Sequence, residues 1–236
     1  TVSNVALVGG GSNPRPGEIS LAHNGILFLD ELPEFKRAVL EVLRQPLEDR
    51  EVTISRALKS VDFPAGFMLV AAMNPSPNGD FYNPDDPLSD SKNNIKRYLS
   101  KLSGPLMERI DLQIEVLPVT YDKLSKKESS ESSYEVRKRV IYARNQQQNR
   151  YAIYEGVYCN AQLSTRQMNK YCVLDKRGEK ILKHAIEKLN LSARSYARIK
   201  KVSRTIADLD NSENILSRHI AEAVQYRSLD RMTKFN

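Results

Sequence analysis

The apolar run at residues 26–29 follows Gly25 and ends at two adjacent acids, Asp30 and Glu31. An unbroken run of this length predicts a strand buried on both faces of a parallel sheet. Ligands of open α/β sheets bind beyond the carboxyl ends of the strands, where both carboxylates would lie. One carboxylate there can hold Mg²⁺ through its water shell, and the other can orient or deprotonate an attacking water. The pattern has the form of a Walker B motif, and a helix N-terminus with two acids is the alternative.

A second apolar run, residues 67–72, predicts a neighbouring buried strand that leads into Asn74. An amide at this place is suited to hydrogen-bond an attacking water or a γ-phosphate. Asparagine is equally common in turns, so the spacing alone leaves both interpretations open.

The segment between the two runs predicts a helix followed by a hairpin. Apolar residues at i, i+4, i+7 and i+8 within 35–43 form one helical face, and Pro46 is expected to end that helix. The alternation over residues 51–63 predicts a β-hairpin whose tip carries Arg56 and Lys59. Solvated charge on a turn and contact with nucleic acid are the two interpretations of this tip.

Two stretches flank this core. Residues 1–19 contain Gly9–Gly11 and two prolines, which predicts an irregular loop; a phosphate-binding loop is rejected because no Lys-Ser or Lys-Thr follows the glycines. At the other end, Leu112, Ile114 and Val116 alternate with polar residues and predict a short strand. Arg109 directly precedes that strand, where an isolated arginine is usually a salt-bridge partner.

The rest of the chain predicts a linker and then a helical bundle. Residues 121–133 have almost no apolar content and cannot form a core. Beyond them, apolar stripes at helical spacing indicate about five helices. On one of these, Arg194, Arg198 and Lys201 fall at i, i+4 and i+7, and a solvated face is the plain interpretation of such a row.

The composition excludes few classes of binding partner. The chain has 236 residues and a net charge of +7, which permits a nucleic-acid partner without requiring one. No apolar run approaches the roughly 20 residues of a membrane span, and no signal peptide is visible. We therefore expect a cytoplasmic protein without a membrane partner, whose Cys159 and Cys172 stay reduced.

Five motifs, taken in order, resemble those of the magnesium-chelatase-like AAA+ ATPases, and most closely the ComM-type (YifB-type) branch. They are the segments 25–32, 43–49, 71–75, 103–111 and 192–199. The resemblance implies an α/β fold: part of an AAA+ P-loop core, with a parallel sheet and a β-hairpin insert, over residues 1–120. It further implies an all-α helical lid over 134–236, joined to the core by the linker at 121–133.

The resemblance also assigns roles to single residues. It implies that Asp30 supports Mg²⁺ and that Glu31 is the catalytic glutamate that activates water. Asn74 matches sensor 1, and Arg109 matches the arginine finger that acts on ATP held by a neighbouring subunit. Arg194 matches sensor 2 on the lid, where it would touch the γ-phosphate.

The family further implies ATP and Mg²⁺ as cofactors and a ring of subunits, with six expected. Inserts like the hairpin at 51–61 point at the central pore in this branch, where helicases of this type would meet DNA, so Arg56 and Lys59 become candidate nucleic-acid contacts. The first hypothesis is therefore a DNA-translocating, branch-migration helicase. The alternatives are a chelatase-type motor that remodels a protein partner without nucleic acid, and a binding module with a decayed ATPase site.

Two departures from the family pattern matter. The phosphate-binding loop, with its Gly-Lys-Ser/Thr, is absent from the sequence, and in the family it precedes the residue that matches Thr1. We therefore expect this chain alone to be inactive, neither binding ATP tightly nor hydrolysing it, with an incomplete sheet. Where many relatives have cysteines after the sensor 1 Asn-Pro, this chain has Ser76 and Asn78, so we expect no metal in that loop.

Overall fold

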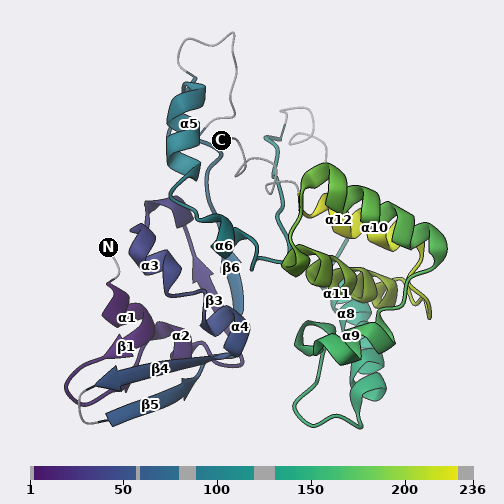
Figure 1. Ribbon diagram of the computed structural model, residues 1–236, viewed down its shortest axis with the longest axis horizontal. Helices are drawn as coiled ribbons and strands as arrows, with labels where there is room; N and C mark the ends of the chain where they lie inside the picture. Colours follow the sequence, from purple (N-terminus) through teal and green to yellow (C-terminus); the bar gives the residue numbers. More distant parts are fainter. Residues whose placement is uncertain (1–2, 57–58, 80–88, 120–130, 228–236) are drawn as a thin grey trace. The chain divides into compact units, whose positions relative to one another are not determined.

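The computed structural model describes residues 3–56, 59–79, 89–119 and 131–227, and it consists of two compact units (Figure 1). The first unit runs to Ile110 and is a mixture of short helices and strands. The second unit begins at Asp111 and contains only helices as regular elements within the described residues. This is the predicted fold class. The predicted linker falls mostly at residues outside the described ranges.

Two parallel strands form the centre of the first unit. β3 (Ile26–Leu29) pairs with β6 (Met68–Ala71) in a register that places Leu29 beside Ala71. The pairing extends past both strands, because the backbone N–H of Ala72 donates to Leu29 O at 2.9 Å. Both predicted strands are thus present, and they end together at one edge.

The prediction that β3 is buried on both faces is wrong for this chain. Leu27 and Leu29 are buried, but Ile26 and Phe28, which alternate with them, are 60% and 59% exposed. Successive side chains of a strand point to opposite faces, so one face of the strand is covered and the other is open. The physical reason is that β3 and β6 make a sheet of two strands in the described chain, with elements packed on one side of it.

The N-terminal segment is more ordered than the predicted loop. It forms α1 (Asn4–Val8), a minimal antiparallel pair of β1 (Gly9–Gly10) and β2 (Arg15–Pro16), and α2 (Glu18–Leu21). The glycines make this possible, because Gly9 has a φ of 103°, which side chains other than glycine rarely tolerate. Gly9 and Gly10 form one strand of a small hairpin and Gly11 begins its turn, so the glycines do not lie at the start of a phosphate-binding helix.

The segment after the acids is broken into short pieces. It contains η1 (Leu32–Glu34), α3 (Arg37–Glu41) and α4 (Pro46–Asp49). The predicted helix is present as α3 but is shorter than expected, and the prediction that Pro46 ends it is wrong. Proline is favourable at the first position of a helix, since its missing N–H has no intrahelical partner there, and Pro46 accordingly begins α4.

The predicted hairpin is confirmed as β4 (Glu51–Arg56) and β5 (Lys59–Pro64), paired antiparallel along their whole length (Figure 1). Its inner face is buried through Val52 and Ile54. Ile54 reaches the N-terminal glycines, since a Cβ placed on Gly9 would lie 2.9 Å from Ile54 Cδ1. The hairpin is therefore anchored to the first 20 residues through Ile54.

Two further helices, α5 (Lys92–Leu99) and α6 (Gly104–Met107), complete the first unit. The strand predicted over 112–116 does not form. The segment is extended, but its Leu112, Ile114 and Val116 are exposed and no strand is paired with it in the described chain. Without a neighbouring strand, its alternating pattern has no sheet to join.

The second unit is a bundle of five α-helices and one 3₁₀ turn within the described residues. They are α8 (Ser133–Tyr151), η2 (Asn160–Gln162), α9 (Thr165–Tyr171), α10 (Lys176–Leu189), α11 (Ala193–Leu209) and α12 (Ser217–Gln225). Side-chain oxygens cap four of them, α8, α9, α10 and α11; for example, Asp175 accepts from Gly178 N at 2.6 Å, and Ser192 accepts from Ser195 N at 3.3 Å. Among the described residues, no helix has the length and apolar character needed to cross a bilayer.

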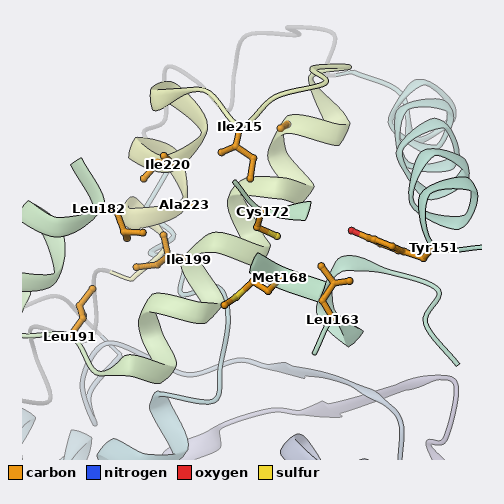
Figure 2. Close-up of a cluster of buried hydrophobic side chains, with 11 residues drawn as sticks. Tyr151, Leu163, Met168, Cys172, Leu182, Leu191, Ile199, Ile215, Ile220 and Ala223 are labelled. Carbon is orange, nitrogen blue, oxygen red and sulfur yellow. The ribbon is translucent and has the colours of Figure 1, made fainter. Parts of the chain in front are cut away.

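Apolar side chains from several helices meet in the core of the second unit, around Ile199 on α11 (Figure 2). A buried carboxylate complements this core at its edge. Asp208 accepts from both Nη atoms of Arg150 at 3.0 and 2.6 Å, from Arg204 Nε at 3.1 Å and from Asn160 Nδ2 at 2.8 Å. Burying one carboxylate is tolerable here because every partner is a charged or amide donor.

Gly17 provides a test of the N-terminal packing. A Cβ at Gly17 would lie 2.4 Å from Gly9 N and 2.5 Å from Leu7 O, which are backbone atoms that cannot rotate away. We expect Gly17→Ala to lower the free energy of unfolding by about 3 kcal/mol, as overpacking does. Urea denaturation measures this. The matched control is Gly104→Ala, where nothing lies within 4 Å and alanine favours the helix, so equal losses in both variants would contradict the packing described.

Candidate functional site

The two acids follow β3 directly at its carboxyl end. Asp30 Oδ1 accepts a hydrogen bond from Glu31 N at 2.8 Å, and Glu31 has a left-handed backbone with a φ of 51°. Leu32 N then donates to Ala72 O at 3.0 Å, which ties the turn to the end of β6. Both acidic residues are exposed. A non-glycine residue with this backbone is unusual and is frequent at functional sites.

Asn74 lies at the same edge of the sheet. It follows the last residue of β6, Ala71, by three positions, and Ala71 is in register with Leu29, the residue before Asp30. Asn74 is exposed like the two acids. Because parallel strands end on the same side, the structure brings the carboxylates and the amide to one open edge, as the sequence predicted.

Tyr98 on α5 is part of this edge, and the sequence analysis assigned it no role. Burial raises the pKa of its hydroxyl, and the negative charges of Glu34 and Glu31 raise it further, while a hydrogen bond from the Asn74 backbone acts in the opposite direction. Tyr98 therefore joins the Asn74 turn to the acidic side of the site. Tyr98 lies three residues after Ile95, a helical spacing that is typical of a packed position. The sequence could not show which loop packs against it.

The exposed carboxylates are better suited to a cation that keeps part of its water shell than to one surrounded by protein ligands. No group of three or more histidines, cysteines or acids is arranged to hold a metal ion in the part of the chain that the structure describes. Mg²⁺ usually keeps several waters and takes one or two carboxylates together with substrate phosphates. Asp30, with one oxygen engaged by a backbone N–H, and Glu31 fit that form of binding.

Arg109, at the end of α6, is not an exposed finger in this structure. Its side chain is 5% exposed and its Nη2 lies 2.9 Å from Glu48 Oε2, while Nη1 donates to Pro105 O at 2.6 Å. Its Nε has no hydrogen-bond partner among the residues that the structure describes. The simpler expectation for an arginine at this place, a salt bridge, is what the structure contains.

Arg194 lies in the second unit, at the second position of α11, and is exposed. The other two members of its row have partners within the second unit. Arg198 forms an ion pair with Asp111, and Lys201 donates to Ala161 O at 3.1 Å, with a pKa lowered mainly by burial. The row is therefore not one uniform solvated face.

Arg56 and Lys59 form the last backbone pair of the hairpin before its tip. Their side chains, and residues 57–58 between them, lie outside the description. The backbone places the two residues directly across from each other at the end of the hairpin farthest from Glu51 and Pro64.

The comparisons with known proteins agree with this architecture. The family model described as magnesium chelatase, subunit ChlI, matches residues 1–124, and the model for the C-terminal part of that subunit matches residues 130–227. The chain therefore belongs to the magnesium chelatase family, whose AAA+ fold agrees with the structure.

Individual relatives show the same membership. The chain is 47% identical over 233 residues to competence protein ComM of Haemophilus influenzae and 44% identical over 233 residues to the uncharacterized protein YifB of Salmonella typhimurium. It is 36% identical over 226 residues to the uncharacterized protein Mb2921c of Mycobacterium bovis. These alignments cover 95–98% of this chain but only 44–45% of each relative. The chain thus spans less than half the length of these proteins.

Replacing Tyr98 tests its place under the site. Tyr98→Phe should cost about 1 kcal/mol of unfolding free energy through the lost hydrogen bond. Because the folded state raises the Tyr98 pKa above its ordinary value of 10, wild-type stability should be complete below pH 10 and should fall as the pH rises further. Denaturation between pH 8 and 11 should show this fall to be shallower in Tyr98→Phe. In the control Tyr226→Phe, whose hydroxyl bonds Glu222 at the surface, the cost at pH 8 should be within 0.5 kcal/mol.

Proposed function

We propose that this chain is part of an ATP-driven ring motor of the magnesium chelatase family that moves along DNA. The observation that carries the proposal is the meeting of Asp30, Glu31 and Asn74 at one open edge of a parallel sheet. Family membership supports the ATPase part, since AAA+ relatives use nucleotide and Mg²⁺.

Each residue has a distinct task in this proposal. Asp30 holds hydrated Mg²⁺, which would neutralise phosphate charge, and Glu31 accepts a proton from the attacking water. Asn74 orients that water through its amide, and Tyr98 fixes the Asn74 backbone from below. Arg109 of a neighbouring copy, in a ring of six, stabilises charge in the transition state, a task worth roughly 10³ to 10⁵ in rate in other phosphoryl-transfer enzymes.

The second unit supplies the lid. Arg194 would contact the γ-phosphate from the start of α11, a helix of 17 residues that is fixed in the core of its unit. A rigid helix of this kind can transmit the loss of a phosphate contact as a movement of the whole unit.

DNA is the favoured substrate because of the positive net charge of the chain and the form of its hairpin. The net charge of +7 favours an anionic partner, and the long hairpin pairs two cationic residues, Arg56 and Lys59, at its far end. A motor that remodels a protein partner shares the ATPase site but needs no such charge. DNA binding therefore separates the two functions.

The chain as given should bind ATP weakly, because a phosphate-binding loop is absent from its 236 residues. Backbone N–H groups and a lysine of such a loop make the strongest contacts to the phosphates. We expect no saturation by ATP below about 1 mM, against the micromolar affinities common for nucleotide sites. Isothermal titration with Mg²⁺ and ATP measures this, and a micromolar dissociation constant would show that the residues present suffice.

DNA binding should fall steeply with salt and depend on the hairpin. In the protein as its complete gene encodes it, Arg56→Gln and Lys59→Gln should each reduce the slope of log K against log salt by about one. The matched control is Lys183→Gln, an exposed lysine on α10 that lies 3.8 Å from Glu187. Fluorescence anisotropy with labelled DNA between 50 and 300 mM salt gives the slopes. Absent binding, or binding without a salt slope, would favour the protein-remodelling motor.

A further inference from the structure

The ion pair of Arg109 connects two parts of the first unit that are far apart in sequence. Its partner Glu48 lies on α4, which ends at Arg50 in a left-handed conformation with a φ of 63°. β4 begins at the next residue, Glu51, so three positions separate the carboxylate from the first residue of the hairpin (Figure 1). A movement of the first residues of the hairpin would therefore also move Glu48, the partner of Arg109.

The environment of Arg109 is not that of a fully satisfied structural arginine. A guanidinium has five N–H donors, and the buried Nε of Arg109 has no acceptor in the structure. Leaving a buried donor unpaired is unfavourable. The resting position thus lacks a contact that a different position, or an incoming anion, could supply.

The two partners differ in their access to solvent. The Glu48 side chain is 36% exposed, whereas that of Arg109 is 5% exposed. A carboxylate at the surface can be rehydrated when its partner leaves, so this pair can open more easily than one in which both charges are buried. The pair is therefore suited to opening and closing.

We propose that Glu48 is a positioning residue for Arg109: it holds the guanidinium inside its own subunit until the hairpin moves, and Arg109 then turns to the phosphoryl oxygens of a nucleotide bound by a second copy of the chain. This inference rests on the proposed function. It adds a role for a residue of segment 43–49 to which the resemblance assigns none, and a physical route from hairpin to nucleotide. The same guanidinium cannot face both anions, so pairing with Glu48 lowers the fraction of Arg109 that is available.

This competition determines whether the basal ATPase rate should rise or fall in each variant. Removing the Glu48 charge should free Arg109 without DNA, so Glu48→Gln should raise the basal kcat for ATP three- to tenfold with KM unchanged. Added DNA should then stimulate the variant little, because its Arg109 no longer waits for the hairpin. Glu48→Asp keeps the charge on a side chain shorter by one methylene, and its basal rate should lie between wild type and Glu48→Gln.

The experiment uses the protein as its complete gene encodes it, with steady-state ATPase rates measured with and without DNA. The control is Asp49→Asn, which removes an exposed carboxylate from the same helix as Glu48 and should leave both rates unchanged. Thermal unfolding of each variant checks folding. The decisive measurement is the double variant: Arg109→Ala should abolish most activity, and adding Glu48→Gln to it should change nothing further.

The outcomes separate this inference from the proposed function. A wild-type protein without ATPase activity would remove the proposed function and this inference with it. A DNA-stimulated wild type whose Glu48→Gln variant has unchanged or lowered basal kcat would overturn the role of Glu48 alone. A rise in rate that persists in the Arg109→Ala background would also overturn it, since Glu48 would then act through another group. If Glu48→Gln does not fold, the intermediate rate of Glu48→Asp decides, and a wild-type basal rate in that variant counts against the proposal.

Discussion

The parallel pairing of β3 with β6 is the constraint on which the candidate site depends. Parallel strands end on the same side of a sheet, so the register of Leu29 with Ala71 determines that the acids and Asn74 share one edge. A shift by one residue would exchange the covered and open faces of β3 and would move Asp30 away from the end of β6. The buried Leu27 and Leu29 hold the register, since they are the residues whose burial such a shift would lose.

Much of this edge could be predicted from the sequence because its signals are local. An apolar run followed by acids, a second run followed by Asn74 and an alternating hairpin each depend on neighbouring residues. The partner of Arg109 could not be predicted in the same way, since Glu48 is 61 positions earlier and lies on α4, which begins at the proline that was expected to end a helix. A proline such as Pro46 can end one helix or begin another, and only the packing of the surrounding chain determines which of the two occurs.

Two predictions were wrong because each pattern is typical of a strand with neighbouring elements that the described chain does not contain. The run at 26–29 is the pattern of a strand covered on both faces, and the alternation at 112–116 is the pattern of a strand in a sheet. In the structure one face of β3 is open, and Ile114 is exposed on an extended segment without a paired strand. The helical unit shows the opposite case. Its apolar stripes and caps are sufficient, because its core around Ile199 comes from its own helices.

The two units are each anchored beside the point where they join. Arg109 is paired with Glu48 in the first unit, and Asp111 is paired with Arg198 of α11 in the second, so Ile110 alone lies between the two ion pairs. A guanidinium that left Glu48 would act on backbone two positions before Asp111, the partner of Arg198. α11 also carries Arg194, one turn before Arg198. Under the proposed function, the arginine finger and the helix of sensor 2 are thus tied to residues 109 and 111 of the same chain, with one peptide unit, that of Ile110, between them.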